Sequence, residues 1–191
     1  MTITFAAESP ARAALLSEIT AKAVVHGEVV LSSGLTADWY IDLRRISLDG
    51  TAAPLVGRAM LELVRKVEFD AVGGLTLGAD PVAAAMLHAA AADPDLVGGR
   101  KINAFVVRKA AKAHGMQQRI EGPSIAGRRV LVVEDTSTTG GSPLTAVEAA
   151  REAGAEVAAV AVIVERGAEP AITAAGLPYL AVFSVADLGL A

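Results

Sequence analysis

The fold is indicated most clearly by the stretch Arg129-Val-Leu-Val-Val-Glu134-Asp135-Thr136-Ser137-Thr138-Thr139-Gly140-Gly141-Ser142. It begins with a purely aliphatic run, which is typical of a strand buried on both faces of a parallel sheet. Two adjacent carboxylates come next, and a run of hydroxyl residues and glycines then leads into a predicted helix over about residues 143–153. Because open α/β sheets bind ligands at the carboxyl ends of their strands, we expect this junction to be the functional site.

The segment from Thr136 to Ser142 is suited to hold a phosphate group. Unpaired amides and the dipole at a helix start attract anions, and glycines let the backbone approach a phosphate closely. Glu134 and Asp135 cannot serve that phosphate, so we expect them to bind sugar hydroxyls or a metal ion beside it. The alternative is an ordinary strand–turn–helix junction in which Asp135 merely caps the helix. Capping needs one such residue, whereas seven polar or glycine positions stand here in series.

Short aliphatic runs alternate with helix-length amphipathic stretches along the rest of the chain. A first helix is predicted from Ser9 as N-cap and Pro10 to a stop at His26-Gly27. Two strands near 28–31 and 39–43, joined by Ser32-Ser33-Gly34, predict an antiparallel hairpin that stands apart as a small N-terminal hood. The later pattern predicts helices over 51–67, 80–92 and 143–153 and strands over 71–74, 104–107, 130–133, 157–164 and 179–183.

This alternation predicts an α/β fold, a parallel sheet flanked by helices. We expect a single domain over residues 1–191, with the helix and hood in about 1–48 and the α/β core in about 49–191. Neither a P-loop motif, Gly-x-x-x-x-Gly-Lys-Ser/Thr, nor a dinucleotide motif, Gly-x-Gly-x-x-Gly, occurs in the chain.

Composition excludes several classes of protein. With 53% hydrophobic and 20% charged residues, wholesale disorder is excluded. The absence of cysteine excludes disulfides and thiolate metal sites, and three scattered histidines argue against a zinc site. The net charge of −4 excludes a protein coated in basic residues for nucleic acid. The longest aliphatic run, Val157 to Val164, is far shorter than the about 20 residues of a membrane span. We therefore expect a soluble cytoplasmic protein that binds neither nucleic acid nor membranes.

A second constellation, Arg108-Lys109-Ala-Ala-Lys112-Ala-His114-Gly115, comes after the strand predicted over 104–107. No acidic residue lies between Val107 and Ile120, although the whole chain is acidic. Such a concentration of positive charge suits a polyanionic ligand, and a solvated basic loop is the alternative.

The segment 129–142 resembles the phosphoribosyl-pyrophosphate (PRPP) motif of the type I phosphoribosyltransferases, in which an acidic pair holds the ribose 2′- and 3′-hydroxyls and the adjoining loop holds the 5-phosphate. The order Arg-Lys-x-x-Lys-x-His-Gly resembles the catalytic loop of the orotate phosphoribosyltransferase family, which clamps the pyrophosphate, usually in the neighbouring subunit's site. The resemblance implies PRPP binding by Arg108, Lys109, Lys112, His114, Glu134, Asp135, Thr136, Ser137, Thr138, Thr139, Gly140, Gly141 and Ser142. It implies catalytic roles for Lys112, His114 and Asp135.

Weaker similarities agree with this family. Residues 31–45 are similar to its "Ser-Gly … Tyr-x-Asp-Leu-Arg" stretch over the orotate pocket, and residues 73–81 resemble its pyrophosphate turn. Arg166 matches the arginine that meets the orotate carboxylate, and Thr138 matches a threonine that also touches orotate. The chain departs from the family at Ser32 and near Gly78, where many members carry a lysine.

The resemblance implies transfer of phosphoribose from PRPP to orotate, giving orotidine 5′-monophosphate and pyrophosphate for UMP biosynthesis. Mg²⁺ is implied as cofactor, held through PRPP and water without a direct protein ligand. A homodimer is implied, with the loop over residues 108–119 reaching the neighbouring active site. Two alternatives are a purine phosphoribosyltransferase, which would give no reason for Arg166, and a PRPP-sensing regulator, which would need a broad basic face.

Overall fold

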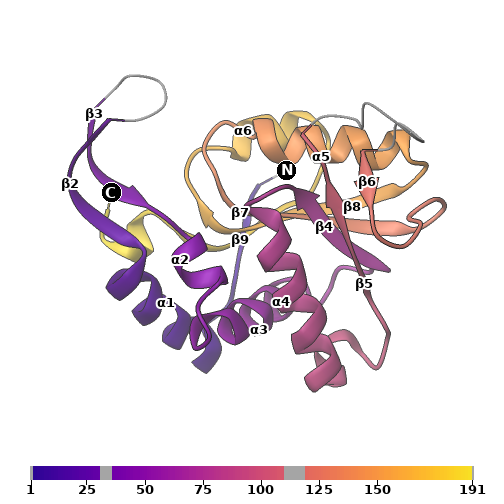
Figure 1. Ribbon diagram of the computed structural model, residues 1–191, viewed down its shortest axis with the longest axis horizontal. Coiled ribbons are helices and arrows are strands. Elements are labelled where there is room, and N and C mark those ends of the chain that lie inside the picture. The colour runs from indigo at the N-terminus through magenta and orange to yellow at the C-terminus, as the bar shows by residue number, and fades with distance from the viewer. Residues whose placement is uncertain (1, 31–35, 110–118, 191) are drawn as a thin grey trace.

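The computed structural model describes residues 2–30, 36–109 and 119–190 (Figure 1). Its larger sheet has seven strands in the order β1-β9-β8-β7-β4-β5-β6, and every neighbouring pair is parallel except β5 with β6. The predicted α/β fold with a parallel sheet is therefore confirmed. The strands are β1 Thr4–Phe5, β4 Ala71–Leu75, β5 Asn103–Val107, β6 Ile120–Glu121, β7 Arg129–Ser137, β8 Glu156–Glu165 and β9 Tyr179–Ser184.

Helices cover both faces of this sheet, which explains why its central strands are continuously aliphatic. Leu131 and Val133 of β7 belong to one hydrophobic cluster, and Val130 and Val132 belong to the other. Figure 1 shows α1, α3 and α4 on one face and α5 and α6 on the opposite face. These helices are α1 Pro10–Lys22, α3 Ala52–Leu63, α4 Ala79–Ala92, α5 Gly141–Glu152 and α6 Glu169–Ala174.

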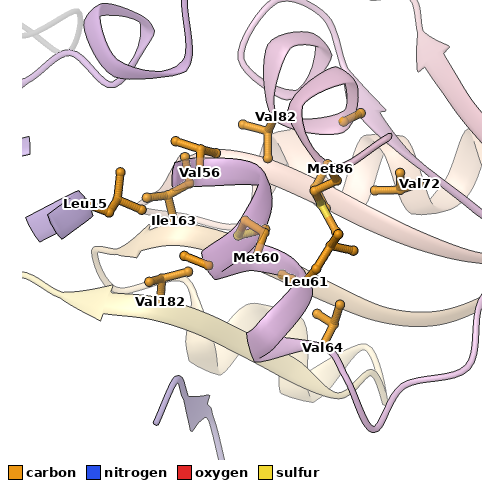
Figure 2. Packing of buried hydrophobic residues seen from close by; sticks show 14 of the residues in the cluster. Leu15, Val56, Met60, Leu61, Val64, Val72, Val82, Met86, Ile163 and Val182 are labelled. Atoms are coloured by element: carbon orange, nitrogen blue, oxygen red, sulfur yellow. The ribbon is translucent and has the colours of Figure 1, made fainter. Parts of the chain in front are cut away.

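The larger cluster packs α3 and α4 against the sheet (Figure 2). Met60 of α3 and Met86 of α4 are fully buried, as is Ile163 of β8. The two helices approach so closely that a Cβ at Gly57 would lie 2.2 Å from the Ala85 carbonyl oxygen. Gly57 of α3 therefore allows the close approach of the two helices.

The hood is a separate two-stranded antiparallel sheet of β2 Val24–Val30 and β3 Thr36–Ile41. Helix α1 begins as predicted, because the Ser9 hydroxyl accepts a hydrogen bond from the Arg12 amide at 3.1 Å. The predicted helix end at Gly27 is wrong. Val24 and Val25 are β-branched and pair with β3, so the helix ends at Lys22 and His26 lies in a strand opposite Trp39. Short segments α2 Arg44–Ser47, η1 Pro94–Val97 and η2 Ala186–Leu188 complete the described structure.

Strand β7 is longer than the sequence pattern predicts. It continues to Ser137, because Glu134, Thr136 and Ser137 still pair with β8. The acidic pair therefore belongs to the strand, and the loop before α5 is only Thr138 to Gly140. Across the described ranges, no helix is both long and apolar enough to cross a membrane.

Candidate active site

A cavity of about 310 Å³ lies at the carboxyl ends of β4 and β7. These strands are neighbours, but the chain continues from β4 toward β5 on one side and from β7 toward β8 on the other. Where the chain leaves two neighbouring strands in opposite directions, a crevice remains between the connections, and open α/β sheets bind ligands there. The lining comes from the end of the hood and the start of α2 (residues 40–44), the turn after β4 (75–78), Lys109, residues 134–136, Ser142 and Arg166.

The acidic pair forms the floor of this cavity, and Glu134 is only 5% exposed. A Cβ at Gly78 would lie 2.2 Å from Glu134 Oε1 and 2.8 Å from Asp135 Oδ1. Glycine is thus the residue that lets the turn after β4 approach the carboxylates. A side chain at position 78 would require the Glu134 and Asp135 carboxylates to move.

Burial raises the pKa of Glu134 to about 8, and the nearby Asp135 carboxylate contributes to that rise. Burial also raises the pKa of Asp135, although its bond from the Thr136 amide (2.7 Å) and the charge of Arg44 oppose that rise. Each carboxylate is therefore costly to ionise here without a ligand. Hydroxyl donors or a cation in the cavity would relieve that cost.

The loop into α5 presents backbone amides. Gly140 is the N-cap residue with φ +80°, and no side chain caps the helix. The Gly141 amide donates to the Thr139 hydroxyl at 3.4 Å. Thr138 and Thr139 are exposed, and Ser142 lines the cavity. This arrangement suits an anion at the start of α5.

Thr136 and Ser137, at the start of the predicted phosphate loop, are held by the rest of the protein, Thr136 through its hydroxyl and Ser137 through its backbone carbonyl. The Thr136 hydroxyl donates to the Val164 carbonyl at 3.0 Å, although the residue lines the cavity. Ser137 is buried, and its carbonyl accepts the Arg166 amide at 3.0 Å. Since both belong to β7, the hydroxyls of this segment that are open to a ligand are those further along the chain.

Arg166 reaches the cavity from the end of β8. Its guanidinium lies 5.1 Å from the centre of the Trp39 ring, so the hood and the core meet at this residue. Its Nε is buried and has no hydrogen-bond partner among the described residues. Burial lowers the pKa of Arg166, and Tyr40 opposes that shift. A buried, unpaired donor costs free energy, so this group is suited to bind an anion.

Only part of the basic segment that begins at Arg108 is seen at the cavity. Lys109 lines it, whereas the Arg108 guanidinium pairs with Glu121 at 3.2 Å and is not in the lining. Lys112 and His114 lie outside the described residues, as does Ser32.

Sequence reasoning did not select Arg44, which also lines the cavity. Its Nε donates to Asp42 Oδ1 at 2.8 Å, and this bond is the largest cause of the lowered pKa of Asp42. The signal was present in the Tyr-x-Asp-Leu-Arg pattern, but the fold was needed to place Arg44 near Asp135.

A larger cavity, of about 630 Å³, lies between the start of α1 and the ends of α3 and α4. Several charged groups at this cavity already pair with other side chains. Arg58 binds Glu62 and Asp93, and Arg12 binds Asp187. Size alone therefore does not identify the functional cavity.

Comparison with known proteins places the chain in a family. The family model described as phosphoribosyl transferase domain matches residues 52–172. Orotate phosphoribosyltransferase of Corynebacterium glutamicum is 58% identical over 182 residues, which are 94% of this chain and 95% of that protein. The crystal structure of Mycobacterium tuberculosis orotate phosphoribosyltransferase with Fe(III) dicitrate is 55% identical with a TM-score of 0.84, covering 95% of this chain and 100% of that chain.

A second structure of the Mycobacterium tuberculosis protein is described as a complex with PRPP, at 49% identity and a TM-score of 0.80. It covers 95% of this chain and 100% of that chain. With relatives this similar over nearly their whole length, the chain belongs to the orotate phosphoribosyltransferase family.

Proposed function

We propose that the protein transfers the phosphoribosyl group of PRPP to orotate, forming orotidine 5′-monophosphate and releasing pyrophosphate. The observation that carries this proposal is one cavity lined by an acidic pair, by a residue of the uncapped start of α5 and by an arginine with an unpaired Nε. The PRPP complex of the Mycobacterium tuberculosis relative supports it.

PRPP lies across β7 in this proposal. Glu134 and Asp135 accept hydrogen bonds from the ribose hydroxyls, and the segment from Thr136 to Ser142 binds the 5-phosphate through the hydroxyls and amides that follow Ser137. Lys109 neutralises the pyrophosphate, and Arg108 joins it after leaving Glu121. Because the sugar hydroxyls bond to the ionised carboxylates, PRPP offsets the cost of holding these charges in a buried site.

Orotate lies on the other side of the cavity, between Arg166 and Thr138. An arginine can meet a carboxylate with two parallel hydrogen bonds, which a lysine cannot reproduce. Trp39 supports the plane of the guanidinium from the hood side. This placement accounts for the unpaired Nε of Arg166.

The residues present fit Mg²⁺ held mainly by the substrate. Glu134 and Asp135 at the cavity offer the hard oxygen donors that Mg²⁺ takes. Mg²⁺ would therefore lie near this pair, held by PRPP oxygens and water. When bound, it supplies neutralisation of the pyrophosphate charge.

The reaction breaks the bond between C1′ of the ribose and the pyrophosphate oxygen and forms a bond from C1′ to the orotate ring nitrogen, whose proton passes to the departing pyrophosphate or to water. Positive charge develops on the ribose, and Asp135, a catalytic residue in this proposal, stabilises it from the sugar side. Lys112 and His114 neutralise the departing pyrophosphate. Lys112→Ala and His114→Ala should therefore lower kcat more than they weaken orotate binding.

The active unit in this proposal is a homodimer: Lys109 lines the cavity of its own subunit, and the rest of the loop over residues 108–119, with Lys112, serves the neighbouring site. This is tested by mixing two inactive variants, Lys112→Ala and Asp135→Ala, under conditions that exchange subunits. Recovered activity is expected, because one of the two sites in a mixed dimer is intact. Recovery of no activity, with mixed dimers demonstrated, would contradict the shared site.

The function itself is tested with purified protein, PRPP and Mg²⁺, following the loss of orotate absorbance. Adenine, hypoxanthine and uracil are assayed in parallel. Mg²⁺-dependent consumption of orotate alone is expected. Consumption of a purine would favour a purine phosphoribosyltransferase, and PRPP binding without any turnover would favour a PRPP sensor.

A further inference from the structure

A buried carboxylate lies directly before Arg166 in the sequence. Glu165 is the last residue of β8, is 9% exposed, and contacts Tyr179, which belongs to the hydrophobic cluster on the α5–α6 side of the sheet. Its Oε2 accepts a hydrogen bond from the Tyr179 hydroxyl at 2.5 Å. Tyr179 is the first residue of β9 and is 1% exposed, so this bond joins two neighbouring strands inside the protein.

The other oxygen of Glu165 holds the turn that carries Arg166. Its Oε1 accepts the amide of Gly167 at 2.6 Å and the amide of Glu169 at 3.3 Å. Gly167 has φ +113°, a conformation that other residues rarely adopt, so the chain turns sharply there. The Arg166 amide donates to the Ser137 carbonyl of β7 at 3.0 Å. Hydrogen bonds therefore hold the backbone at Arg166 and at Gly167, the residue that follows it.

Burying the Glu165 carboxylate costs free energy that packing alone would not offset. An ionised group loses hydration when it is buried, and only several good hydrogen bonds offset that loss. Here the bonds come from a tyrosine and from two amides of the turn after β8, so the charge is compensated by the groups that shape that turn. The side chain of the next residue, Arg166, lines the cavity.

We propose that Glu165, held in place by Tyr179, is a positioning residue that sets the direction of Arg166 toward the orotate carboxylate. This inference rests on the proposed function. It assigns substrate positioning to two residues that do not contact the substrate. It predicts a change in the KM for orotate and none in the KM for PRPP. Bidentate pairing depends on direction, so a small rotation of the turn weakens it.

The test compares Tyr179→Phe, Glu165→Gln and Glu165→Leu. Tyr179→Phe keeps the buried ring but releases one carboxylate oxygen, and the KM for orotate should rise about fivefold, the size of one lost hydrogen bond. Glu165→Leu frees both amides and should raise it by tens of fold. Glu165→Gln can still accept from Gly167 and donate to Tyr179, so it should stay within about twofold of the wild type. The KM for PRPP should change less than about twofold in all three.

Phe183→Leu is the matched control. Phe183 is a buried aromatic residue of the same strand, but it belongs to the cluster on the other face of the sheet, against Arg12. Its loss should lower the stability to urea without changing the orotate KM. An equal rise in the orotate KM for Tyr179→Phe and Phe183→Leu, or a parallel rise in the PRPP KM, would overturn the positioning role.

Failure of this inference is distinguishable from failure of the proposed function. If the wild type consumes no orotate, the function is wrong. If Arg166→Ala raises the orotate KM but Tyr179→Phe does not, the function stands and the positioning role falls. Should Glu165→Leu not fold, Tyr179→Phe and Glu165→Gln still decide the question.

Discussion

The core edge and the hood face each other across the cavity, and they are held in place differently. The core edge comprises the carboxyl ends of β4, β7 and β8, and each of these strands pairs with a neighbour on both sides. The two hood strands, within the described residues, pair only with each other. Trp39 of the hood meets the core edge through a ring–guanidinium contact with Arg166. Groups that need accurate placement therefore stand on the sheet, and the hood covers them.

The largest loss of stability is expected from a substitution at the core edge where the backbone leaves no room for a side chain. A Cβ at Gly74 would lie 2.1 Å from the Val133 carbonyl oxygen, so Gly74→Ala must push β4 away from β7. We expect the free energy of unfolding to fall by about 3 kcal/mol, measured by urea denaturation. Gly50→Ala is the control, since nothing lies within 4 Å of its added Cβ. Equal stability of the two variants would show that the core edge is less rigid than its packing indicates.

The next largest effect is expected on orotate turnover, from a substitution of Arg166, where the hood and the core edge meet. Arg166→Lys keeps the charge but loses bidentate pairing, and kcat/KM for orotate should fall about 100-fold, or about 2.7 kcal/mol. The KM for PRPP should not change. Arg128→Lys, at an exposed position just before β7, serves as the control for the same exchange. An unaltered orotate KM in Arg166→Lys would remove this residue from the orotate site.

A pH effect distinguishes the floor of the core edge from the exposed surface. The pKa of Glu134 is raised from 4.5 to about 8, mainly by burial, so the folded protein retains a proton that the unfolded chain releases over that range. Its contribution to stability is therefore present below about pH 4.5 and is lost as the pH rises through 8. Glu134→Gln should exceed the wild type in stability at pH 9 by at least about 1.4 kcal/mol, the value of one pKa unit. At pH 5 that advantage should disappear.

Unfolding in urea at both pH values measures this difference without substrate. Glu148→Gln, on the exposed side of α5, is the control for the same exchange outside the cavity. A constant difference between Glu134→Gln and the wild type from pH 5 to 9 would contradict the raised pKa.

The smallest effect is expected in the hood. Trp39→Leu removes the ring beside Arg166, and a cation–π contact at a partly exposed site contributes about 0.5–1 kcal/mol. The KM for orotate should rise about threefold, measured under saturating PRPP. If Trp39→Leu impairs turnover as much as Arg166→Lys, the hood positions the substrate as strongly as the core edge does.

Sequence patterns located the helices and strands of the core well but misjudged their ends. The start of α1 at Ser9 and Pro10 was predictable because a cap is a local interaction. The end of α1 and the length of β7 were not, because strand pairing with β3 and β8 decided them. Among the predicted site residues, the positions on β7, the loop before α5 and Arg166 were accessible to sequence reasoning. The domain boundaries and the roles of all the predicted site residues remain predictions.

The fold class and the family could be inferred from the amino-acid sequence alone. Continuous aliphatic runs between helices are compatible with a parallel sheet covered on both faces, and the segment 129–142 places its acidic pair at the edge of such a sheet. The folded chain was needed to reveal that Gly78 packs against Glu134, that Trp39 contacts Arg166, and that Tyr179 holds Glu165. Each of these contacts joins segments that local patterns treat separately. Periodicity describes which face of an element is buried, but not which distant side chain it meets.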